Sequence, residues 1–144
     1  MAKEKKHDEE DLQHKYLEMQ LLRQQIGAMV EQKQQLDQVV SEIGSTIDTL
    51  KKLESIKKGE EIWSQIGSGT FVKSDIKEVD RVLVAVGAGV VISETRDKAE
   101  KILQSRVEEL EKLGSEIVGQ ANGYLERIKK LEPELEKAAK NNNE

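Results

Sequence analysis

The sequence predicts a mainly α-helical fold with a small β part. Two long helices form an antiparallel coiled-coil hairpin, and two tandem β-hairpins join them and assemble into a β-barrel between subunits. Three observations support this prediction. Aromatic residues are only 3% of the 144 residues and charged residues are 35%, a poor composition for a compact globule. Apolar residues follow a helical repeat in both outer parts of the chain, whereas the middle has β-branched runs separated by glycine pairs.

An apolar stripe predicts a first helix over residues 8–58, after a disordered tail at residues 1–7. Alternating steps of three and four along the chain select one face, on which only Lys33 is not apolar: Met19, Leu22, Ile26, Met29, Lys33, Leu36, Val40, Ile43, Ile47 and Leu50. Such a spacing keeps a narrow apolar face toward a partner helix. Gly59 follows two lysines and predicts the helix end, because glycine readily adopts the left-handed cap conformation.

A second stripe predicts a helix over residues 95–139, with Thr95 as its N-cap and a disordered tail at residues 140–144. Its face lacks an apolar side chain only at Gly114: Leu103, Val107, Leu110, Gly114, Ile117, Ala121, Tyr124, Ile128, Leu131, Leu135 and Ala138. Pro133 lies off this face and should kink or fray the last turns. Gly119 and Gly123 join Gly114 in one cluster, and either bending freedom or tolerated substitution would explain them.

The middle, residues 61–93, has the composition of two β-hairpins. The segments "GSG" and "GAG" each lie between β-prone runs, and short glycine loops between strands are typical of hairpin turns. Glycine suits such turns because it takes a positive φ at no steric cost. We therefore assign the turns to Gly67 and Gly69 in the first hairpin and to Gly87 and Gly89 in the second.

The glycine pairs do not support a nucleotide-binding enzyme, which is the remote alternative. Neither pair is followed by the Lys-Ser/Thr of a phosphate loop or by a third glycine, and a strand rather than a helix follows each. His7 and His14 lie among charged residues and are expected to be solvated. We predict no catalytic residue, no metal ligand and no cofactor, hence a protein that is not an enzyme.

Charge and hydropathy exclude two further classes of partner. The net charge of −5 and the lack of a long basic stripe weigh against nucleic acid. No apolar stretch is long enough to span a membrane, and the N-terminus lacks the apolar region of a signal peptide. With no cysteine in the chain, we expect a cytoplasmic protein.

The hairpins predict an oligomer. A lone two-stranded hairpin is marginal in water and exposes its edges, and here both faces of the second hairpin are apolar. Closing a sheet across several subunits would remove these edges. We assign the oligomerisation surface to Ile66, Phe71, Val72, Val82, Val84, Val86, Val90 and Ile92.

The segments "IGSGTFVK" and "VLVAVGAGVVISET", between two long helices, resemble the alpha subunits of archaeal prefoldin, also called GimC. The presence of two hairpins indicates the alpha class, because the beta class has one. The sequence departs from the family at "IWSQIG", where Trp63 precedes the first glycine turn and the family often has a Val-Pro-like pair.

The resemblance implies an ATP-independent chaperone. Prefoldin is a hexamer of two alpha and four beta subunits that captures unfolded or nascent polypeptides at the tips of its coiled coils and delivers them to a group II chaperonin. The residues that we expect to bind clients here are Leu12, Tyr16, Met19, Leu131 and Leu135. The alternatives are that these residues only close the coiled coil, and that the protein is a structural coiled-coil scaffold that binds no client.

Overall fold

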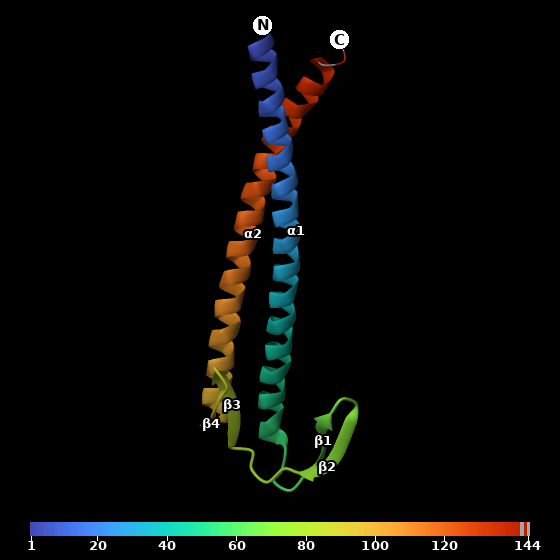
Figure 1. Cartoon of the computed structure of the whole chain (residues 1–144). Coiled ribbons are helices and arrows are strands. Elements are labelled where there is room, and N and C mark those ends of the chain that lie inside the picture. The colour runs from blue at the N-terminus through green and yellow to red at the C-terminus, as the bar shows by residue number, and fades with distance from the viewer. Residues whose placement is uncertain (142, 144) are drawn as a thin grey trace. The chain divides into compact units, whose positions relative to one another are not determined.

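A computed structural model of the chain describes residues 1–141 and residue 143. The elements follow one another as α1 (Ala2–Lys52), a short 3₁₀ turn (Leu53–Ser55), β1 (Glu61–Gly67), β2 (Thr70–Asp75), β3 (Arg81–Gly87), β4 (Val90–Thr95) and α2 (Arg96–Asn141) (Figure 1). The chain divides into two compact units. Unit 1 contains Met1–Gln38 and Glu111–Glu144, and unit 2 contains Val39–Leu110.

The first helix differs from its predicted bounds at both ends. It begins at Ala2, so residues 2–7 are helical and our prediction of a disordered tail there is wrong. It ends at Lys52 rather than at residue 58. Gly59 has a φ of +92° but does not cap the helix. Instead its N–H donates to the carbonyl of Ile76 at 2.7 Å, because the chain around Gly59 already pairs with the end of the first hairpin.

The second helix begins as predicted and ends later. Thr95 is the N-cap, since its Oγ1 accepts a hydrogen bond from the N–H of Lys98 at 3.3 Å. The helix continues through Pro133 to Asn141, so residues 140 and 141 are helical, although we expected them in a disordered tail. Residues 142 and 144 of that expected tail lie outside the described residues.

Unit 1 is held together by the predicted apolar faces of α1 and α2. Met19, Ile128 and Leu131 form a buried cluster, which we call the seam cluster. Half-buried apolar side chains pack against it: Leu22, Ile26 and Leu135. The sequence had indicated all six of these residues from the repeat alone, so the coiled-coil prediction is confirmed in this unit.

Two interruptions of the apolar faces, Lys33 and Gly114, lie opposite each other within unit 1. A Cβ atom at Gly114 would lie 3.2 Å from Cε of Lys33, so the lysine stem occupies the space that the glycine leaves. The Lys33 ammonium then bonds to Asp37 one turn along α1. Gly114 therefore has a packing role, whereas no atom lies within 4 Å of a Cβ built at Gly119 or Gly123 and nothing in the structure explains these two.

Unit 2 has its own core, in which the second hairpin packs on the helices. The buried residues of this core are Ile47, Leu50, Val84, Ala99, Leu103 and Val107. Val84 belongs to β3, and Val82 of the same strand packs against the core. The carbonyl of Ala85 accepts a hydrogen bond from Nη2 of Arg106, which ties β3 to α2.

Each hairpin is a separate antiparallel pair, β1 with β2 and β3 with β4, as predicted. In the first turn only Gly69 has a positive φ (+64°), and Gly67 lies outside the left-handed region, unlike our expectation. In the second turn Gly87, Ala88 and Gly89 all have positive φ, with Ala88 at +50°. The second turn thus has a left-handed alanine between its two glycines.

Candidate functional site

Unit 1 has an apolar groove between the beginning of α1 and the end of α2. It has a volume of about 470 Å³. We call it the terminal groove, and it is lined by Leu12, Gln13, Tyr16, Leu17, Leu135, Ala138 and Ala139. Tyr16 is 52% exposed and Leu17 is 54% exposed. Closing the coiled coil does not require exposed apolar side chains of this size. An apolar groove lined by them is typical of a binding site.

The structure divides the five predicted client-binding residues into two groups. Leu12, Tyr16 and Leu135 line the terminal groove. Met19 and Leu131 instead lie in the buried seam cluster, and Leu131 has no exposed surface. For these two residues the packing supports the alternative that they close the coiled coil.

Sequence reasoning missed part of the groove. Leu17, Gln13 and Ala139 lie beside the apolar face rather than on it, so a search restricted to the repeat does not select them. The available signal was Leu17 itself, a leucine on a helix face that the repeat leaves to solvent. Two adjacent large side chains at positions 16 and 17 widen the apolar surface beyond the narrow seam.

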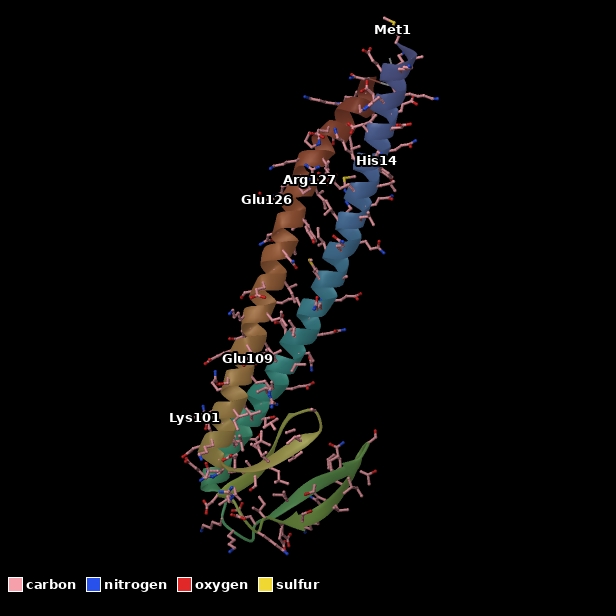
Figure 2. The ribbon with its side chains drawn as sticks, turned by 60° about the vertical axis from the view of Figure 1, so that its left-hand side comes forward. Met1, His14, Lys101, Glu109, Glu126 and Arg127 are labelled. Atoms are coloured by element: carbon pink, nitrogen blue, oxygen red, sulfur yellow. The ribbon has the colours of Figure 1, made fainter. Side chains whose placement is uncertain are left out.

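Ion pairs between the helices flank the seam cluster on the side of the groove. Arg127 donates from Nε to Glu18 Oε1 at 2.7 Å and from Nη2 to Glu18 Oε2 at 3.2 Å. Lys15 bonds to Glu134 of α2 at 3.1 Å and to Asp11 at 3.0 Å. In Figure 2, Arg127 is labelled on α2 and His14 on α1, and both lie in unit 1.

These contacts shift the pKa values of the groups that make them. Hydrogen bonds from Arg127 lower the pKa of Glu18, so this contribution to stability is present above the ordinary pKa of glutamate and is lost as pH falls through the lowered value. Hydrogen bonds to Asp11 and then to Glu134 raise the pKa of Lys15. That contribution is present below the ordinary pKa of lysine and is lost as pH rises through the raised value.

A second apolar surface lies on the first hairpin. Large side chains are exposed on both of its faces: Ile62, Trp63, Ile66, Phe71 and Val72. Trp63 is 66% exposed, and the ammonium of Lys73, its cross-strand partner, lies 5.9 Å from the ring centroid. Three of the predicted oligomerisation residues, Ile66, Phe71 and Val72, are therefore available on this hairpin.

The second hairpin has one covered face and one open face. Val84 is 7% exposed and faces the core of unit 2, together with the half-buried Val82. Leu83, the residue between them, is 74% exposed, and Val91 is exposed on the same open face. Assigning Val82 and Val84 to an oligomerisation surface is thus at odds with the structure, in which helices of the same chain cover them.

The remaining predicted oligomerisation residues lie near the turn or beside the covered face. Val86 and Val90 are exposed, and Ile92, the cross-strand partner of Val84, is half-buried. The sequence could not decide between the two faces of this hairpin, because both are apolar. The decision depends on helix residues distant in sequence, which form the core that Val84 joins, and on Arg106, whose guanidinium binds the carbonyl of Ala85.

Metal-binding groups and membrane-spanning helices are both absent from the described residues. Within residues 1–141 and 143, no group of three or more His, Cys, Asp or Glu side chains is placed to hold a metal ion. Over the same residues, neither helix is apolar enough along a sufficient length to cross a bilayer.

Comparison with known proteins identifies the fold and the family. The family described as "Prefoldin subunit" matches residues 22–141. A prefoldin subunit alpha from Thermofilum pendens is 30% identical over 112 residues, which cover 77% of this chain and 87% of that protein. A prefoldin subunit alpha from Methanosarcina barkeri is 35% identical over 111 residues, 73% of this chain and 77% of that protein.

Two solved structures share the fold at 20% identity. The filamentous prefoldin of Methanocaldococcus jannaschii has a TM-score of 0.75 and covers 81% of this chain and 97% of its own. The prefoldin beta subunit from Thermococcus strain KS-1 has a TM-score of 0.57 and covers 89% of this chain and 91% of its own. Together with the match over residues 22–141, these findings show that the chain belongs to the prefoldin subunit family.

Proposed function

We propose that this chain is the alpha-type subunit of an ATP-independent chaperone that captures unfolded or nascent polypeptides in the terminal groove. The family gives the chain a chaperone-type role, and the groove is the observation that supports capture at this place. Its exposed Tyr16 and Leu17 offer apolar surface that the helix pair itself does not use.

The chemistry of the groove suits varied clients. Leucine, tyrosine and alanine side chains line most of it, and they contact apolar segments without a fixed hydrogen-bonding pattern. Each contact of this kind is weak. Several grooves carried by one oligomer would raise the overall affinity through multivalency.

We propose that the hairpins assemble the oligomer. Exposed apolar side chains on the first hairpin and the open face of the second hairpin support this proposal. The expected assembly is a hexamer of two alpha and four beta subunits in which hairpins of different subunits close into a barrel. A prefoldin beta subunit is the partner, and delivery of clients to a group II chaperonin in the cytoplasm is the expected next step.

Light scattering tests the proposed function. The full-length chain is first assembled with an archaeal prefoldin beta subunit in buffer without nucleotide. A chemically denatured protein is then diluted into this buffer. A chaperone suppresses the rise in scattering, and added ATP changes nothing. A coiled-coil scaffold without client binding, the alternative function, leaves the scattering as high as in the absence of the complex.

A further inference from the structure

Glu18 and Arg127 lie at the boundary between the open groove and the closed seam cluster. The two residues share two nearly parallel hydrogen bonds, at 2.7 and 3.2 Å, in the bidentate geometry that makes arginine–carboxylate pairs directional. Glu18 directly precedes Met19 in the chain, and Arg127 directly precedes Ile128. The pair is therefore attached to the two helices at the cluster itself.

A second interhelical pair stands on the other flank of the same cluster. Arg23 Nη2 lies 3.1 Å from Oε1 of Glu132. Arg23 follows the seam residue Leu22, and Glu132 follows the seam residue Leu131. Residues before and after the seam positions of a coiled coil lie on opposite flanks, so the two ion pairs bracket the cluster from both sides.

Lys15 marks the point at which the closed seam ends. It interrupts the apolar face between Leu12 and Met19, and its ammonium bonds to both Asp11 and Glu134. A charged group at a seam position must keep its partners or be hydrated, so Lys15 interrupts the apolar seam between Leu12 and Met19. Two groove residues flank Lys15 in the chain: Leu12 lies three residues before it and Tyr16 directly follows it.

We propose that Glu18 and Arg127 form a clasp that sets how far the seam of unit 1 opens, and thereby how long an apolar client segment the protein admits. With the clasp closed, only the terminal groove is available. With the clasp open, Met19, Ile128 and Leu131 extend the apolar surface inward. This inference rests on the proposed function, because it assigns a length preference to the same groove.

The lengths follow from helix geometry. Leu12 to Leu17 spans about 8 Å along α1, which matches about two residues of extended chain. Opening the seam as far as Ile26 lengthens this surface to about 21 Å, which matches about six extended residues. The clasp therefore selects short apolar segments over long ones.

The test uses the full-length chain with Glu18→Gln and Arg127→Gln combined, which removes both charges, keeps the side-chain shape at position 18 and shortens the side chain at position 127. The matched control combines Lys51→Gln and Glu100→Gln, an interhelical pair in unit 2 with a separation of 3.6 Å. Hydrogen exchange of the segments around Met19 and Ile128 is followed by mass spectrometry. Binding is measured with two labelled peptides whose leucine segments are about two and about six residues long.

We expect the clasp variant to speed exchange around Met19 and Ile128 by up to about fivefold, the factor that corresponds to an exposed ion pair, and the control to leave it unchanged. The longer peptide should bind the variant more tightly than the wild type, and the shorter peptide equally. The reversed pair, Glu18→Arg with Arg127→Glu, should restore both properties, which a purely steric role of either side chain would not allow.

Unchanged exchange in the seam segments, or an unchanged preference between the two peptides, overturns the clasp. A wild-type protein that binds neither peptide contradicts the proposed function of the groove. In that case the exchange measurement still decides whether the ion pair limits the opening of the seam, so the two failures are distinguishable.

Discussion

Replacing Tyr16 and Leu17 together by serine is expected to remove most of the aggregation suppression while leaving the helices folded. Both side chains are more than half exposed in the free protein, so their loss should change the free energy of unfolding by no more than about 0.5 kcal/mol each. In a complex the same side chains would be covered by client. Burying one such side chain contributes roughly 1.5–3 kcal/mol, so the double replacement should weaken client binding at least tenfold.

The control for this variant is Leu113→Ser with Val118→Ser. These two residues are also exposed apolar side chains of α2 in unit 1, but they do not line the terminal groove. The control also removes two exposed apolar side chains and should suppress aggregation as well as the wild type. Equal loss in both variants would mean that general surface hydrophobicity, and not the groove, captures the denatured protein.

The second large effect concerns the two faces of the hairpin formed by β3 and β4. Leu83→Asp combined with Val91→Asp is expected to abolish assembly with the beta subunit while each chain stays folded. Both residues are exposed in the free chain, so the new carboxylates remain hydrated there. In an assembled barrel they would be buried without a partner, which costs several kcal/mol per group.

Val84→Asp should act differently, because Val84 is buried against the helices of its own chain. A carboxylate at this position is expected to destabilise unit 2 by about 4 kcal/mol or more. Light scattering coupled to size-exclusion chromatography gives the mass of each mixture, and circular dichroism gives the unfolding temperature of each chain. Normal assembly by the Leu83 and Val91 variant would show that the open face is not the assembly surface.

The sequence carried the information about pairing but not about the ends of the helices. The repeat of three and four residues identified the seam cluster, and its two interruptions, Lys33 and Gly114, proved to pack against each other. A helix end is decided by weaker effects. Gly59 looked like a cap, yet its N–H is taken by Ile76 of the first hairpin, a contact that no local pattern announces.

The candidate site was likewise predicted only in part from the sequence. Leu12, Tyr16 and Leu135 could be predicted because a fraying coiled coil exposes its seam, and these residues line the groove. The repeat placed Leu131 on the apolar face, but the sequence could not decide between a closed and a frayed seam there, since that depends on how far the two helices remain in contact. The orientation of the second hairpin was equally undetermined, because both of its faces are apolar and a hydrogen bond from Arg106 in α2 holds β3.

Site-specific photo-crosslinking tests most directly whether clients bind in the terminal groove. A photoreactive phenylalanine analogue is placed at Leu17 or, as the matched position, at Leu113, and the full-length complex is irradiated with a denatured client in the absence of nucleotide. Capture in the groove predicts strong crosslinks from position 17 and few from position 113. Equal yields from the two positions, or crosslinks from position 113 alone, would contradict it.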